Sequence, residues 1–187
     1  MELSKTAYVI LGMLRTRGHT GYEIKSIVDH STRFFWAASY GQIYPELKRL
    51  EDAGLVEGES VPEDGRRRRA YSLTPAGRQA LKDWLTSGEP LHSELRHEGL
   101  LRFFFADVID PHEQLELVRT MREMHERIRG ELVAVRPNAE EARDARGQEF
   151  PLRTLEHGIA YQDFVVEWCS QLERELAGAR DSLTTGI

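Results

Sequence analysis

Signals for helix starts are unusually clear in this sequence, and they constrain its fold more than any other feature. The four predicted starts are Thr20, Ser39, Thr74 and Asp110. The first two are followed three positions later by Glu23 and Gln42, which completes a capping box that satisfies free backbone N–H groups. The last two each precede a proline, which suits the first position of a helix. The chain is therefore expected to be mainly helical.

Apolar residues at helical spacing predict three helices before Gly54, a typical C-cap residue. The first helix is expected from Ser4 to about Arg15, the second after Thr20 and the third after Ser39. Pro45 lies deep for a helix start, and the sequence leaves open whether it kinks the third helix. The side chains expected to point inward are Val9, Ile10, Met13, Leu14, Tyr22, Ile24, Ile27, Val28, Ile43, Leu47 and Leu50.

The apolar period changes after the third helix and predicts a β-hairpin. Short strands are expected at Leu55–Val56 and Tyr71–Leu73. Residues 62–65 between them include an Asp-Gly pair that suits a tight turn, and four arginines follow at 66–69. A fourth helix should follow the second strand and end before residues 88–90, the best candidate domain boundary.

Residues beyond this boundary are expected to form helices. One is expected over residues 95–108 and the next from Asp110 to about Val135, whereas the polar stretch 136–148 around Pro137 resembles a loop. The last helix, from about Leu152 to Leu176, carries two apolar stripes. Both stripes must be covered, so we expect the same chain to cover one and a second subunit the other.

Charge divides the chain into two halves. The net charge is −6, but residues 1–88 carry +2 and residues 89–187 carry −8. This asymmetry indicates a half that faces nucleic acid and an acidic half that mediates assembly.

Composition excludes several classes of protein. Cys169 is the single cysteine, which excludes an internal disulfide framework and fits the reducing cytoplasm. We find neither an N-terminal apolar signal nor an apolar run of about 18 residues, so we expect no membrane span. The histidines form no ligand pattern, and His92 and His97 are five positions apart. We therefore expect neither a metal nor another cofactor.

Three capped helices followed by a hairpin is the order of a winged helix-turn-helix, whose third helix enters a DNA major groove about 12 Å wide. Gln42 near the start of that helix can pair with adenine, and helix N-termini attract phosphate. Arginines in the wing can neutralise phosphates or enter a minor groove. The predicted DNA contacts are Thr20, Ser39, Tyr40, Gln42, Tyr44, Lys48, Arg66, Arg67 and Arg68.

Three ordered blocks resemble the PadR family of transcriptional regulators. They are T-G-Y-E-I-K at 20–25, G-Q-I-Y-P-E-L-K-R-L-E-D-A-G-L-V at 41–56 and R-R-A-Y-S-L-T-P-A-G-R at 68–78. The stretch E-G-L-L-R-F-F-F-A-D at 98–107 is similar to the start of that family's larger C-terminal domain. The resemblance implies a homodimer through the C-terminal helices, and repression that is relieved by a small ligand such as a phenolic acid or a hydrophobic drug.

The predicted fold is therefore mainly α with a small β-hairpin. We expect a winged helix-turn-helix at residues 1–88, a helical dimerisation and effector domain at 91–178, and a tail at 179–187. Two such domains in a dimer would bind a pseudo-palindromic operator in double-stranded DNA. An apolar effector could stack on aromatic residues of the last helix while basic groups orient its polar end. The predicted effector contacts are Arg153, His157, Tyr161, Phe164 and Trp168.

Two other functions compete with this interpretation. The first is a helical protein-interaction module that uses its winged helix without specific DNA binding, and weak or salt-insensitive DNA binding would favour it. The second is a small-molecule enzyme. We find no paired carboxylates, phosphate loop or nucleophile–base motif to support it, and no catalytic residue is predicted.

Overall fold

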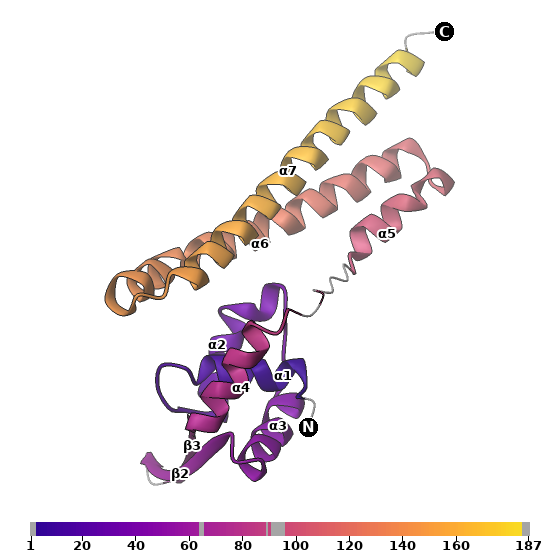
Figure 1. Cartoon of the computed structure of the whole chain (residues 1–187). Helices are drawn as coiled ribbons and strands as arrows, with labels where there is room; N and C mark the ends of the chain where they lie inside the picture. The colour runs from indigo at the N-terminus through magenta and orange to yellow at the C-terminus, as the bar shows by residue number, and fades with distance from the viewer. Residues whose placement is uncertain (1–2, 64–65, 89, 91–95, 185–187) are drawn as a thin grey trace. The chain divides into compact units, whose positions relative to one another are not determined.

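The computed structural model describes residues 3–63, 66–88, 90 and 96–184 of the chain. The chain divides into two compact units, Met1–Leu91 and His92–Ile187 (Figure 1). The part described is mainly helical with one small sheet, as the sequence predicted. In these residues no helix is both long and apolar enough to cross a membrane.

The helices of the first unit begin where the capping signals place them. Helix α1 spans Lys5–Met13, α2 spans Gly21–Asp29, α3 spans Tyr40–Asp52 and α4 spans Pro75–Leu85. At the start of α2 the Glu23 N–H donates to Thr20 Oγ1 at 3.2 Å, and the Thr20 N–H donates to the Glu23 carboxylate at 2.7 Å. Helix α3 continues through Pro45 to Asp52, so this proline does not end the helix.

The sheet is larger than the predicted hairpin. Strand β2 spans Val56–Glu63 and β3 spans Arg66–Leu73, each eight residues long, and they pair antiparallel from Val56–Leu73 to Glu63–Arg66. A third strand, β1 at His19–Thr20, pairs with the other side of β3 and gives the order β1-β3-β2. Two residues carry no readable alternation, which is why the sequence did not predict β1. The predicted turn at Asp64-Gly65 lies outside the described residues.

One apolar core holds the first unit together. It includes Ile10, Leu14, Ile24, Val28, Ile43, Leu47 and Leu50, all expected to point inward. The expectation for Tyr22 is wrong, because 58% of this residue is exposed. It is the second residue of α2 and lies on the face of the helix opposite the core residues Ile24 and Val28.

The second unit is built on two long helices. Helix α5 spans Glu98–Phe104, a 3-10 turn η2 spans Ala106–Val108, α6 spans Pro111–Arg146 and α7 spans Glu149–Thr184. Figure 1 shows α6 and α7 running side by side in opposite directions. The single helix expected over residues 95–108 is thus two shorter segments, and Leu95 lies outside the described residues.

The prediction of a loop at residues 136–148 is wrong. Helix α6 passes through Pro137 and ends only at Gly147, which caps it with a left-handed φ of 64°. A proline inside a helix costs one hydrogen bond, here the bond to the Val133 carbonyl four residues earlier. Val133 is 41% exposed, and Leu132 and Ala142 on either side of this turn are buried. Packing of α6 on α7 therefore outweighs the local preference of the sequence.

Both apolar stripes of α7 meet partners within the chain. Val165 and Cys169 form a core with Val118 and Met121 of α6. Partly buried side chains pack around this core, namely Phe103, Tyr161, Trp168, Leu172 and Leu176. The chain itself thus covers part of both stripes, and the covering of the rest by a second subunit stays a prediction.

Candidate nucleic-acid interface

Helix α3 separates its core residues from its predicted DNA contacts. Ile43, Leu47 and Leu50 are buried. The predicted contacts are all exposed on the remaining surface, namely Ser39, Tyr40, Gln42, Tyr44 and Lys48. The capped helix therefore presents a continuous polar and aromatic surface from its first turn.

The Gln42 side chain is already engaged at the start of α3. Its Oε1 atom accepts the Ser39 N–H at 2.9 Å and the Ser39 hydroxyl at 3.1 Å. An amide oxygen has two lone pairs, and these two bonds occupy both. Pairing with adenine needs an acceptor as well as a donor, so it would require Gln42 to leave the cap.

Three exposed tyrosines form a ladder across α2 and α3. The rings of Tyr22 and Tyr40 stack with centroids 6.5 Å apart, and those of Tyr40 and Tyr44 with centroids 6.1 Å apart. The ammonium of Lys25 lies 5.4 Å from the Tyr40 ring centroid and also pairs with Asp29. We call Tyr22, Tyr40 and Tyr44 the tyrosine ladder. Tyr22 was not predicted at this surface because the apolar spacing of α2 indicated a core position for it.

A pocket beside the ladder joins the start of α2 to the wing. Its volume is about 360 Å³, and its lining residues are Thr20, Gly21, Tyr22, Tyr44, Arg68, Arg69 and Tyr71. A Cβ at Gly21 would lie 2.6 Å from the Tyr44 ring, so only glycine allows this close approach. The pocket brings together three predicted DNA contacts from separate segments, Thr20, Tyr44 and Arg68.

The wing arginines do not all have the same role. Arg69 pairs with the Glu51 carboxylate, which raises the pKa of its guanidinium. The same carboxylate accepts the Gly58 N–H at 3.1 Å, so this contact fastens the wing to the end of α3. Arg68 is exposed and lines the pocket. The side chains of Arg66 and Arg67 lie outside the described residues.

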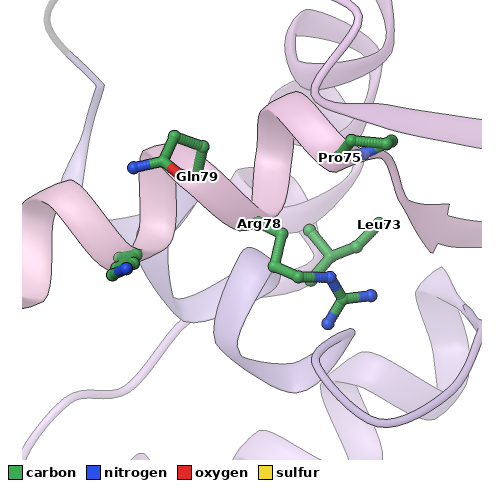
Figure 2. A pocket seen from close by; sticks show the side chains of 5 residues that line it. Leu73, Pro75, Arg78 and Gln79 are labelled. Atoms are coloured by element: carbon green, nitrogen blue, oxygen red, sulfur yellow. The ribbon is translucent and has the colours of Figure 1, made fainter.

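A second pocket of about 360 Å³ lies at the start of α4. Figure 2 labels four of its lining residues, Leu73, Pro75, Arg78 and Gln79, and the fifth is Lys82. The Arg78 guanidinium donates to the Arg15 carbonyl at 3.3 Å, which ties α4 to the segment after α1. No ligand contact was predicted among these residues.

The predicted effector residues have different surroundings in the second unit. Trp168 packs edge-on against Phe103 with centroids 5.5 Å apart, and Tyr161 packs edge-on against His125 with centroids 6.3 Å apart. His157 is exposed and so is Phe164, at 66%. Arg153 is also exposed and pairs with Glu149 at 2.7 Å and Glu156 at 3.0 Å. The described chain thus places two of the five in packed contacts and three at its surface.

Two histidines of the second unit form a hydrogen-bonded chain that the sequence did not suggest. The Leu100 N–H donates to His97 Nδ1 at 3.0 Å, and His97 Nε2 lies 2.8 Å from His125 Nε2. His125 Nδ1 in turn bonds to the Gln162 carbonyl oxygen. A single proton between the two Nε2 atoms gives every ring nitrogen of these two histidines a hydrogen-bond partner. Both imidazoles are therefore neutral in this arrangement. Within the described residues, no group of three or more potential ligands could hold a metal ion.

Three capped helices, an exposed third-helix face and a two-stranded wing define a winged helix-turn-helix protein. Residues 10–83 match the transcriptional regulator PadR-like family, and residues 95–177 match the virulence activator alpha C-terminal domain. The first unit is therefore similar to the PadR-like transcriptional regulators, and the second unit is similar to the virulence activator alpha C-terminal domain.

Individual relatives agree with this assignment. The chain is 34% identical over 113 residues to the negative transcriptional regulator PadR of Bacillus subtilis, covering 60% of this chain and 62% of the relative. The structure is similar to that of B. subtilis PadR with operator DNA, at 26% identity and a TM-score of 0.78, covering 91% of this chain and 98% of that one. It is also similar to B. subtilis PadR with p-coumaric acid, at 25% identity and a TM-score of 0.75 over the same shares.

Proposed function

We propose that this regulator acts in the cytoplasm as a homodimer that binds operator DNA and represses transcription. The observation that supports DNA binding is that Tyr44 of the exposed α3 face lines one pocket together with Arg68 of the wing and the buried Thr20. With α3 in a major groove, the tyrosine ladder faces the base edges, and Arg68 in the wing is the proposed contact for a phosphate. The similarity to PadR bound to operator DNA supports the same interpretation.

A second copy of the chain is the proposed partner of the segment α5–η2. Four large apolar side chains are exposed here within eight residues: Leu101 at 61%, Phe104 at 77%, Phe105 at 59% and Val108 at 85%. Contiguous exposed apolar residues mark interaction surfaces, because water-exposed patches of this kind are unfavourable in a monomer. A symmetric dimer would cover the same segment in both copies and present two winged domains to a palindrome.

We further propose that a small aromatic ligand releases the repressor, at a site that includes Arg153, His157, Tyr161, Phe164 and Trp168. The similarity to PadR bound to p-coumaric acid supports the ligand class. The exposed basic groups of Arg153 and His157 could receive a carboxylate, and Phe164 could receive an aromatic ring. Such a ligand can release DNA only if it binds the arrangement that does not bind DNA more tightly.

Selection of bound sequences from genomic DNA fragments tests the central proposal. We expect enrichment of an imperfect palindrome whose half-sites lie about one helical turn, or a multiple of it, apart. Affinity for the enriched sequence should fall steeply with salt, because Lys and Arg side chains displace counterions from the phosphates. Failure to enrich any sequence, or salt-insensitive binding, would instead favour a protein-interaction module.

A further inference from the structure

We propose that the tyrosine ladder recognises thymine methyl groups and is the main determinant of base preference in this protein. The inference rests on the proposed function, since it assumes that α3 enters the major groove of an operator. It goes further by naming the chemical group that is read and the side chains that read it. It also replaces Gln42, the residue from which base reading was expected.

The tyrosine ladder is both exposed and well ordered, as expected of a preformed contact surface. Tyr22, Tyr40 and Tyr44 are 58%, 44% and 49% exposed, yet each ring has a stacked neighbour. Tyrosine loses little conformational entropy on binding because only two side-chain torsions must be fixed. Stacking restricts these torsions before DNA arrives, so the surface needs little rearrangement.

Contacts beneath the ladder hold it in place. The Lys25 ammonium lies 5.4 Å from the centroid of the Tyr40 ring, and its side chain is only 16% exposed. Its pairing with Asp29 balances its charge locally, so Lys25 acts chiefly as support for the ring. At the other end, Gly21 lets the Tyr44 ring pack against the start of α2. Tyr40 is thus the central ring, with a tyrosine on either side.

The chemistry of the groove selects thymine as the partner. The C5-methyl of thymine is an apolar group that the major groove presents at a base edge, and apolar side chains contact it. The described exposed face of α3 offers two aromatic rings, Tyr40 and Tyr44, whereas the Gln42 amide oxygen is occupied by Ser39. An aromatic surface beside an occupied amide favours methyl recognition over adenine pairing.

Deoxyuridine provides a direct test, because it differs from thymidine only in lacking this methyl group. Each thymine of the selected operator is replaced in turn, and binding to the full-length protein is titrated. We expect an affinity loss of about three- to fivefold at one or two positions in each half-site, the size expected for one buried methyl. Tyr40→Ala should bind the thymine and deoxyuridine operators equally at the position that Tyr40 contacts.

Two matched variants separate the ring from other effects. Tyr40→Phe keeps the ring and should retain the thymine preference. This control separates loss of the ring from misfolding as the cause of any loss of preference in Tyr40→Ala. Gln42→Glu keeps the acceptor at the helix cap and should retain the preference at every position. If deoxyuridine leaves wild-type affinity unchanged while the operator is still bound specifically, methyl recognition is overturned and the proposed function stands. If no sequence is bound specifically, both proposals are overturned.

Discussion

At the scale of single residues, Gln42 is a side chain for which the sequence allows two different roles. Its position in a recognition helix suggests base contact, whereas its spacing from Ser39 predicts a helix cap. The structure uses it in the cap, with Oε1 2.9 Å from the Ser39 nitrogen. We predict that Gln42→Ala destabilises the protein by about 1 kcal/mol, typical of a lost cap, whereas Gln42→Glu retains stability. Thermal unfolding of the two variants measures this difference.

The Gln42→Glu variant also tests whether Gln42 reads a base. Gln42→Glu introduces a negative charge near DNA and should weaken binding to all sequences alike. Its ranking of operator variants should therefore match that of the wild type. A changed ranking at one base pair would show that Gln42 reads that base, contrary to this prediction.

Local signals explain why some residues were placed correctly and others were not. The caps at Thr20 and Ser39 depend on side chains three positions apart, so a sequence window contains all of the interaction. The exposure of Tyr22 and the continuity of α6 through Pro137 depend on neighbours far along the chain. Those neighbours are brought close only by tertiary packing, which single-sequence periodicity does not contain.

At the scale of elements, the histidine chain links the start of α5 to α6 and α7. His97 is the N-cap of α5, and its Nδ1 atom accepts the Leu100 N–H. Burial and then the neighbouring His125 lower the pKa of His97 below its ordinary value of 6.5. Protonation of both rings would place two N–H groups against each other across 2.8 Å. The contact is therefore stable only while at least one ring remains neutral.

Other charged groups on these helices do not neutralise the pair. Charged side chains within five positions of His97, His125 or Gln162 include Glu98, Arg102, Arg122, Glu126, Arg129 and Asp163. The ionic members form pairs of their own: Arg102 with Glu98, Arg122 with Glu126 and Arg129 with Asp163. No carboxylate contributes to the pKa shift of His97.

A definite pH dependence of stability follows from the lowered pKa of His97. Below about pH 6.5 the unfolded chain binds more protons at this site than the folded chain does. The contribution of His97 to stability is therefore present above that pH and is lost as the pH falls towards the lower, folded-state value. We predict that melting temperature falls less between pH 7 and pH 5.5 in His97→Asn, which retains a capping side chain without a titrating ring.

His157→Gln provides the matched control, because His157 is an exposed histidine of the same unit. Its melting temperature should follow the wild-type pH profile. If His97→Asn also follows the wild-type profile, the pair does not contribute to acid sensitivity. Parallel titration of the His97 ring by NMR would detect the lowered pKa directly.

At the scale of the whole molecule, the sequence predicts a dimer but leaves open which surface forms it. The two stripes of α7 suggested a subunit contact, and Phe103, Val118 and Met121 cover part of them within the chain. The exposed segment α5–η2 offers an alternative, because Phe104 and Val108 are 77% and 85% exposed. The sequence contained both apolar sets and could not distinguish which one the monomer leaves uncovered.

Disruption of this segment should separate the subunits without disturbing the winged domain. We predict that Phe104→Asp makes the full-length protein largely monomeric at micromolar concentration, because a carboxylate would be buried without a partner in the dimer. Operator affinity should fall by about 100-fold or more, since a monomer loses the advantage of binding two half-sites at once. Sedimentation measures the oligomeric state, and titration of operator DNA measures the affinity.

Phe35→Asp is the control, because it removes a phenylalanine that is 63% exposed in the first unit and should leave the dimer intact. A stable Phe104→Asp dimer would rule out α5–η2 as the essential surface, whereas a monomer with undiminished affinity would contradict the bivalent mode of operator binding.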